Sequence, residues 1–174
     1  MTIAQHLLER HTDVSRYNVM IDEKEGVATF LLFDLSGAVS GYQQYRPAAD
    51  KVRKNDQNDG RYFTYKSTGR HAVFGLETWN WSGPLYLVEG IFDCVRLHNL
   101  GYAAIATLSN DPKQLSEWLW TINRPLYAIC DSGEGGAKLA NFAHRHVTCA
   151  GGDLGSMTND AGARTLPTFE TTPS

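Results

Sequence analysis

Two acidic residues, Glu89 and Asp131, each follow a short apolar run and precede a glycine and a segment with helical spacing. The two runs are residues 85–88 and 126–130. Apolar runs of this length, ending on a polar residue before a helix, are typical of buried parallel strands. Open α/β sheets place their functional sites outside the carboxyl ends of the strands. If the two strands are neighbours, the two carboxylates therefore meet at one edge of the sheet.

Two carboxylates held close together need a cation or a proton to offset their repulsion. Magnesium prefers oxygen ligands, keeps several of its waters and neutralises the charge that phosphoryl and nucleotidyl transfer develop. Glu89 and Asp131 are therefore candidate ligands of a divalent metal. The alternative is that Glu89 caps the helix that follows it and that Asp131 opens a turn.

The second half of the chain alternates between strand and helix patterns. Strands alternating with helices at this spacing predict an α/β fold with a parallel sheet and right-handed crossovers. Trp118 and Trp120 cannot share one helix face, and we expect Trp120 to lie in the core. The expected elements are a strand at 85–88, a helix at about 91–100, a strand at about 103–107, a helix at about 112–121, a strand at 126–130, a helix at about 136–145 and a strand at 146–149.

The first half of the chain predicts a small β-rich lobe. A helix over residues 2–10 is capped by Thr2, with Ile3, Leu7 and Leu8 on one face. Two or three antiparallel strands follow, and residues 61–67 form another strand. We expect a polar loop at 47–60, and divide the chain into a basic β-rich lobe at 1–83, an α/β domain at 84–162 and a flexible tail at 163–174.

Positive charge is concentrated in one segment, residues 46–70, although the whole chain has a net charge of −3. The segment holds seven basic and three acidic residues, so its charge of +4 leaves −7 for the rest. Such a distribution suits an anionic partner on the segment and a cation site elsewhere. The candidate residues for binding nucleic acid or nucleotides are Arg46, Lys51, Arg53, Lys54, Arg61, Lys66 and Arg70.

The overall composition, with 42% hydrophobic and 20% charged residues, is ordinary for a globular domain. No apolar run is long enough for a membrane span, and the N-terminus has no signal-peptide core. Cys94, Cys130 and Cys149 lie in apolar surroundings without CxxC spacing, which predicts reduced, buried thiols. We therefore expect a cytoplasmic protein.

The order of these motifs resembles the TOPRIM domain, which topoisomerases, DnaG-type primases, phage primase-helicases and some nucleases share. LYLVEGIFD supplies the glutamate of that pattern as Glu89, with Asp93 where primases often carry a further aspartate. ICDSGEGG supplies Asp131 and the closing glycine, and GGDLGSM carries an acidic residue in the late glycine-rich segment. The resemblance implies a metal site formed by Glu89, Asp131, Glu134 and Asp153, with Glu89, Asp131 and Asp93 as catalytic residues. One position departs from the pattern: Gly133 stands where the family has a second aspartate.

The upstream half is similar to the polymerase core of DnaG-type and phage-type primases in particular. In those primases a lobe with its own short motifs precedes the TOPRIM domain. The motifs are matched here by DLSGAVSGY at 34–42, by residues 61 and 62, by residues 69 and 70 and by FGL at 74–76, in that order. The resemblance implies synthesis of short RNA primers on single-stranded DNA with Mg²⁺ or Mn²⁺. It also implies ribonucleotides as substrates, a replicative helicase or another replication protein as a partner, and a phage or mobile element as the source. The alternatives are a catalytically weakened nucleic-acid-binding or regulatory module, and a nuclease that cleaves phosphodiesters.

Overall fold

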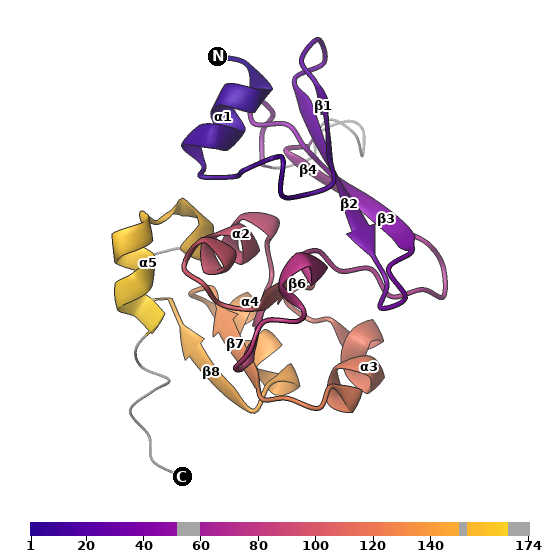
Figure 1. Cartoon of the computed structure of the whole chain (residues 1–174), viewed down its shortest axis with the longest axis vertical. Helices are drawn as coiled ribbons and strands as arrows, with labels where there is room; N and C mark the ends of the chain where they lie inside the picture. The colour runs from indigo at the N-terminus through magenta and orange to yellow at the C-terminus, as the bar shows by residue number, and fades with distance from the viewer. Residues whose placement is uncertain (52–59, 150–152, 167–174) are drawn as a thin grey trace. The chain divides into compact units, whose positions relative to one another are not determined.

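The computed structural model describes residues 1–51, 60–149 and 153–166 of the chain (Figure 1). Two compact units, Met1–Phe74 and Gly75–Ser174, make up the molecule. Most of the predicted polar loop, at 52–59, and most of the predicted tail, at 167–174, lie outside the described residues. No helix in the described part has the length and apolar character that crossing a membrane requires.

The first unit begins with a helix whose start the sequence determines. Helix α1 (Ile3–Glu9) is capped by Thr2, whose hydroxyl accepts from the backbone N–H of Gln5 while the Gln5 side chain accepts from the N–H of Thr2. Ile3 and Leu7 are buried, as predicted, but Leu8 is 71% exposed. The prediction for Leu8 was wrong because a buried stripe with i, i+4 spacing turns the next residue toward solvent.

Four antiparallel strands follow in a meander, and the sheet has the order β1-β2-β3-β4. One face of this sheet forms the core of the unit. Helix α1 contacts that face, where His6 Nε2 lies 2.8 Å from the Tyr45 hydroxyl. The predicted β-rich lobe is confirmed. The strands are β1 (Val19–Asp22), β2 (Val27–Phe33), β3 (Val39–Tyr45) and β4 (Tyr62–Lys66), and the buried face carries Ala28, Phe30, Leu32, Gln43 and Tyr45.

The second unit is built on a parallel sheet with the order β6-β5-β7-β8. All residues of β5 and β6 are buried, as expected for central strands covered on both faces. The strands are β5 (Leu85–Val88), β6 (Ala104–Ala106), β7 (Leu126–Cys130) and β8 (Arg145–Thr148); the helices are α2 (Ile91–Asn99), α3 (Ser116–Thr121), α4 (Glu134–Ala137) and α5 (Asn159–Thr165). The predicted α/β sheet with flanking helices is confirmed.

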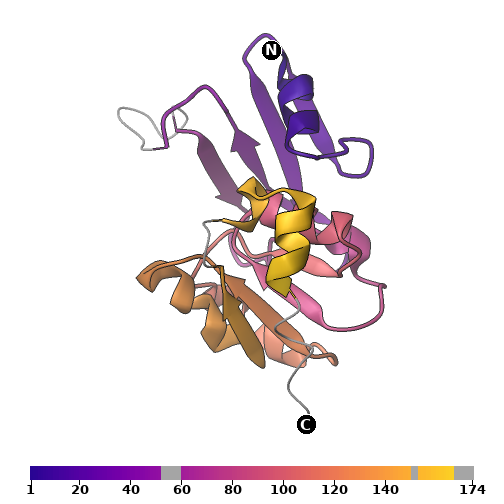
Figure 2. The ribbon, with the colours of Figure 1, turned by 90° about the vertical axis from the view of Figure 1, so that its left-hand side faces the viewer.

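Helix α5, yellow in Figure 2, packs against α2, and Arg96 of α2 donates a hydrogen bond to the side chain of Asn159. It occupies residues that the sequence assigned partly to a loose tail. The three cysteines are buried and form no disulfide, as predicted.

Two local predictions in this unit were wrong. The helix expected at about 136–145 is only α4 followed by a 3-10 turn at Leu139–Phe142. Gly136 and Asn141 lower the helix propensity of this stretch. Trp120 is 51% exposed, whereas Trp118 is buried and stacks on Trp79 with 6.2 Å between ring centroids. Trp118, and not Trp120, therefore lies in the core.

Candidate active site

Strands β5 and β7 are neighbours, which brings Glu89 and Asp131 to the same edge of the parallel sheet. Leu87 of β5 lies opposite Ala128 of β7 in parallel register, so both strands end at this edge. Glu89 follows β5 directly and Asp131 follows β7 directly. Both residues are half-buried. The condition stated from the sequence, that the two strands are neighbours, is met.

The electrostatics of this edge show that its carboxylates sense one another. Burial raises the pKa of Glu89, and the charge of Asp131 raises it further. Burial also raises the pKa of Asp131, and the charge of Asp153 adds to that shift. Asp131 therefore disfavours ionisation of Glu89, and Asp153 disfavours ionisation of Asp131, as like charges do in a partly desolvated site. We call Glu89, Asp93, Asp131 and Asp153 the acidic cluster.

Asp93 ties two parts of this cluster together. Its side chain is buried, Oδ2 accepts from the backbone N–H of Gly90 at 3.1 Å, and Oδ1 accepts from the N–H of Gly155 at 2.6 Å. Burial raises the pKa of Asp93 to about 7, with further contributions from the charges of Asp131 and Asp153. Both oxygens are engaged by backbone amides, so Asp93 holds the start of α2 against the loop of Asp153. Sequence reasoning missed this positioning contact, which joins residues 62 positions apart.

Asp153 is exposed and precedes the 3-10 turn Leu154–Ser156. Its charge acts on the buried Cys149 thiol, whose pKa is raised to about 11 by burial first and then by Asp93, Asp131 and Asp153. Glu134 is the first residue of α4, and its side chain lies outside the described part of the structure. Among the residues described, no three His, Cys, Asp or Glu side chains are arranged to hold a metal ion.

A loop after β6 completes the edge and holds the backbone of Glu89. The N–H of Thr107 donates to the carbonyl of Val88 at 2.9 Å, and the N–H of Leu108 donates to the carbonyl of Glu89 at 3.0 Å. Leu108 has a φ of 59°, which is uncommon for a bulky residue. Strained backbone of this kind is concentrated at functional sites. The sequence gives no signal for it.

The stability of the chain should depend on pH through these carboxyls. Groups with raised pKa values keep their protons in the folded state at pH values where the unfolded chain has already lost them. The free energy of unfolding should therefore fall as pH rises, by on the order of 2 kcal/mol between about pH 5 and about pH 8. Urea unfolding at both pH values measures this difference. Asp93→Asn should reduce it and the surface variant Asp160→Asn should not; equal pH dependence in both variants would contradict the assignment.

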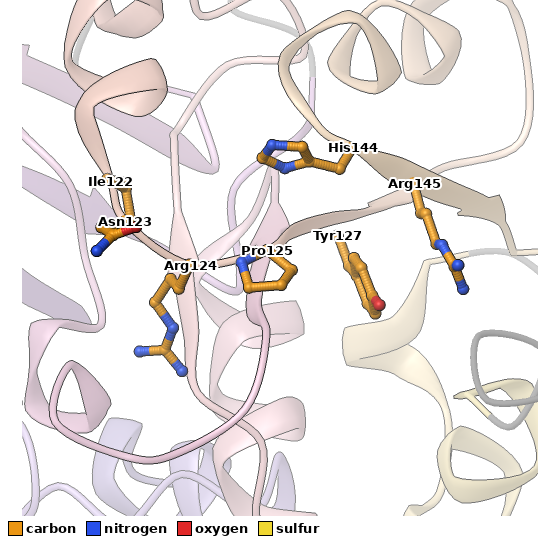
Figure 3. A pocket seen from close by; sticks show the side chains of 7 residues that line it. All are labelled: Ile122, Asn123, Arg124, Pro125, Tyr127, His144 and Arg145. Carbon is orange, nitrogen blue, oxygen red and sulfur yellow. The ribbon is translucent and has the colours of Figure 1, made fainter. Parts of the chain in front are cut away.

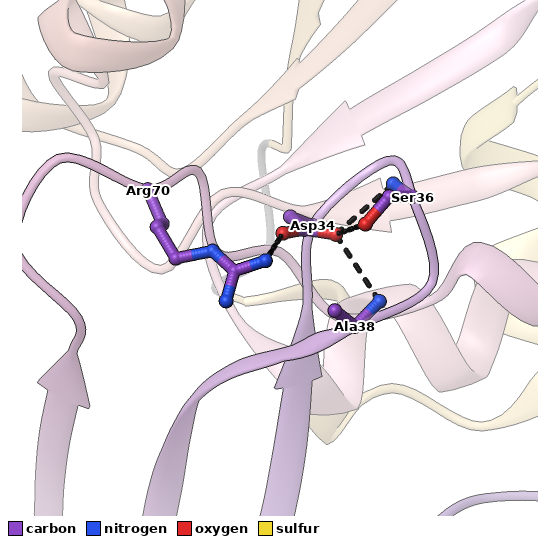
Figure 4. A network of polar contacts seen from close by, with 4 residues as sticks. All are labelled: Asp34, Ser36, Ala38 and Arg70. Carbon is purple, nitrogen blue, oxygen red and sulfur yellow. Dashed lines mark hydrogen bonds and ion pairs between the residues drawn. The ribbon is translucent and has the colours of Figure 1, made fainter.

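The described basic residues of segment 46–70 lie on the first unit, and one of them is fixed by a turn (Figure 4). Asp34 Oδ1 accepts from the N–H and hydroxyl of Ser36 and from the N–H of Ala38, while Oδ2 pairs with Arg70 at 2.5 Å. These contacts, led by the Ser36 hydroxyl, lower the pKa of Asp34. The Asp34 turn therefore holds the Arg70 guanidinium in place.

The other basic residues differ in how they are held. Arg46 Nη2 donates to Gln44 Oε1 at 2.9 Å, and Arg61 Nε donates to the carbonyl of Ala49 at 3.0 Å. Lys51 is exposed, and burial lowers the pKa of Lys66. Arg53 and Lys54 lie outside the described residues.

A pocket of about 540 Å³ lies in the second unit, and Figure 3 shows the side chains that line it. It is lined by Arg124 and Pro125, which precede β7, and by His144 and Arg145 at the start of β8. These are the amino ends of the strands, opposite the edge that carries the acids. The Arg124 guanidinium donates to several backbone carbonyls, including that of Trp79 at 2.9 Å. The pocket is therefore separate from the candidate site.

No protein-family model matches the sequence, and no curated protein matches it. Solved primase structures, in contrast, match nearly the whole chain. The E. coli primase catalytic core has a TM-score of 0.65 at 16% identity, covering 95% of this chain and 71% of that one. A DnaG primase catalytic domain bound to ssDNA has 0.64 at 16%, covering 96% and 69%. The primase fragment of the bacteriophage T7 primase-helicase protein has 0.62 at 14%, covering 89% and 68%.

The chain has the fold of a primase catalytic core. This fold confirms the predicted resemblance to primases and the predicted order of a β-rich lobe before an α/β sheet. At these identities the likeness concerns the fold, and the chemistry must be argued from the residues. In this primase-core fold, the acidic cluster lies at the carboxyl edge of the parallel sheet, where open α/β sheets place their sites.

Proposed function

We propose that this protein is a primase-like enzyme that synthesises short RNA primers on single-stranded DNA with a divalent metal. The observation that carries the proposal is the pairing of β5 with β7, which brings Glu89 and Asp131 together on a primase-core fold. The raised pKa values of both residues support it. Burial raises each pKa first, the charge of Asp131 adds to the shift of Glu89 and the charge of Asp153 adds to that of Asp131, and a bound cation would offset this negative charge.

The residues present fit magnesium or manganese. Glu89 and Asp131 supply oxygen ligands on rigid strand ends, and Asp153 and Glu134 are the further candidates. A metal bound there would neutralise charge on the reacting phosphates. Asp93 was predicted to be catalytic, and we now propose that it positions the loop of Asp153, because its oxygens already accept two backbone hydrogen bonds.

The basic segment would bind the template and the incoming ribonucleotides. Its local charge of +4 suits phosphate groups, and binding should weaken as salt rises. One matching primase domain has been solved with ssDNA and another with an RNA/DNA hybrid, which supports the same partners here. A helicase or another replication protein remains a proposed partner. The residues proposed for this role are Arg46, Lys51, Arg53, Lys54, Arg61, Lys66 and Arg70.

A specific observation favours a second candidate, a nucleic-acid-binding module without full catalysis. Gly133 replaces the second aspartate of the TOPRIM pattern, and its φ of 111° is a conformation that side-chain-bearing residues rarely adopt. The backbone conformation at this position therefore favours glycine. The site lacks a carboxylate here, and the backbone would also disfavour an aspartate.

The variant Gly133→Asp tests this point. A Cβ atom at Gly133 would have no neighbouring heavy atom within 4 Å, but the backbone conformation should cost about 1 kcal/mol of stability or more. Gly133→Ala carries the same backbone cost without a carboxylate. We expect equal manganese affinity in the two variants, measured by calorimetry. Tighter binding by Gly133→Asp alone would show that the site lacks a ligand that aspartate can restore.

The function itself is tested by incubating the protein with single-stranded DNA, radiolabelled ribonucleotides and Mg²⁺ or Mn²⁺. The proposal predicts short oligoribonucleotides that depend on both the template and the metal. DNA binding without products would favour the module, and degradation of the template would favour a nuclease. Either of these results would contradict primer synthesis.

A further inference from the structure

The face of the antiparallel sheet opposite its core carries aromatic side chains. In the register of β3 with β4, Tyr42 lies opposite Tyr65, and Gln44 lies opposite Phe63. Side chains alternate between the two faces along a strand, so these four residues share one face. None of the four is buried, in contrast to the core residues on the other face. We call Tyr42, Phe63 and Tyr65 the aromatic face.

The three rings form one continuous surface. Tyr42 and Tyr65 stack with 5.4 Å between ring centroids and an interplanar angle of 27°. Tyr42 and Phe63 lie 6.1 Å apart at 49°. Tyr65 is 50% exposed, which is high for an aromatic side chain in a strand. A planar ring system can therefore reach Tyr65 from solvent.

Two arginines continue this face at one end. The pairing of β3 with β4 extends beyond the strands, because the N–H of Arg46 donates to the carbonyl of Arg61 at 2.8 Å. By the same alternation, Arg46 follows Gln44 on the aromatic face, and Arg61, whose Nε donates to the carbonyl of Ala49 at 3.0 Å, lies beside Arg46 at this end. The Arg46 guanidinium is directed along this face, since it donates to the Gln44 side chain at 2.9 Å. Cationic groups thus lie at the Phe63 end of the aromatic face.

Exposed aromatic rings beside arginines suit a ligand with both flat apolar groups and anionic groups. Unpaired bases stack on aromatic side chains, and arginines pair with the phosphates that link them. A duplex offers no free base faces along its length. The local charge of +4 complements a polyanion and disfavours a basic protein partner.

We propose that the aromatic face binds single-stranded DNA, with bases stacked on Tyr65 and its neighbours and phosphates near Arg46 and Arg61. This inference deepens the proposed function, on which it rests, by naming the surface that holds the template. It assigns a role to side chains that the acidic cluster does not use.

The affinity for a fluorescein-labelled oligothymidylate of about 10 nucleotides, measured by fluorescence anisotropy at low salt, tests the inference. Tyr65→Leu keeps an apolar side chain but removes the ring, and should weaken binding about 10-fold. Tyr62→Leu is the matched control, since Tyr62 is 37% exposed on the same strand but on the opposite face. It should change the affinity by less than about twofold.

Crosslinking with an oligonucleotide that carries 5-bromodeoxyuridine gives a second measure. Crosslinks to the peptides with Tyr42, Phe63 or Tyr65 support the proposal, and crosslinks confined to other peptides overturn it. Equal affinity of Tyr65→Leu and the unchanged protein, no binding of oligothymidylate, or binding of oligouridylate alone would each overturn it too. Binding that Tyr65→Leu weakens in a protein that makes no primers would refute primer synthesis and leave the aromatic face standing.

Discussion

Glu89→Gln should reduce oligoribonucleotide synthesis on single-stranded DNA by on the order of 10²–10³-fold while increasing the stability of the fold. The amide keeps the shape of the side chain but cannot offer a charged oxygen to a metal. Burial, and then the charge of Asp131, raise the pKa of Glu89 in the native protein, and the uncharged amide avoids both costs. We expect an increase in unfolding free energy of about 1 kcal/mol near pH 8.

The combination of lost activity and gained stability is what separates a catalytic role for Glu89 from a structural one. Product formation is followed with radiolabelled ribonucleotides, and stability by urea unfolding of the same preparations. Glu117→Gln is the control, because Glu117 is an exposed carboxylate in the first turn of α3. It should change neither quantity. Full activity in Glu89→Gln would argue against the assignment. A decrease in its unfolding free energy alongside the lost activity would argue against it too.

Gly136→Ala should destabilise the second unit by about 3 kcal/mol and impair the acidic cluster. A Cβ atom at this position would lie 1.9 Å from the backbone oxygen of Asp131 and 2.8 Å from its carbonyl carbon. Because these are backbone atoms, the chain itself must move. The displaced segment carries Asp131, so metal-dependent activity should fall even where the variant remains folded.

Gly162→Ala provides the matched control. Gly162 lies in α5, where a Cβ atom would meet Leu100 and Arg96 at ordinary contact distances of 3.4 Å and more. Replacing a helical glycine by alanine there should raise stability by about 0.5–1 kcal/mol. Thermal unfolding followed by circular dichroism measures both effects. A stable, fully active Gly136→Ala would show that the loop after β7 does not need this close approach.

The sequence predicted the sheet and its acidic edge because both depend on local patterns. Apolar runs followed by helices identify parallel strands, and the position of Glu89 and Asp131 at their ends follows from that alone. Which of the two tryptophans in α3 is buried could not be predicted in this way. Trp118 and Trp120 lie on different helix faces, and which face is buried depends on a distant contact with Trp79.

The finer structure of the site escaped prediction for a similar reason. The hydrogen bond from Gly155 to Asp93 joins segments far apart in the chain, and no periodicity marks it. The left-handed conformation of Leu108 runs against the preference of its side chain, so the sequence argues against it. The glycine at 133 was visible as a departure from a motif, but only the structure shows that its backbone conformation favours glycine.

Manganese binding measured by electron paramagnetic resonance shows whether Glu89 and Asp131 form a divalent-metal site. Free Mn²⁺ gives a sharp signal that is lost on binding, so a titration reports affinity without requiring activity. We expect saturable binding near pH 8 that Glu89→Gln and Asp131→Asn each weaken at least about 10-fold, while Glu117→Gln does not. No binding by the unchanged protein, or equal binding by all of these variants, would contradict it.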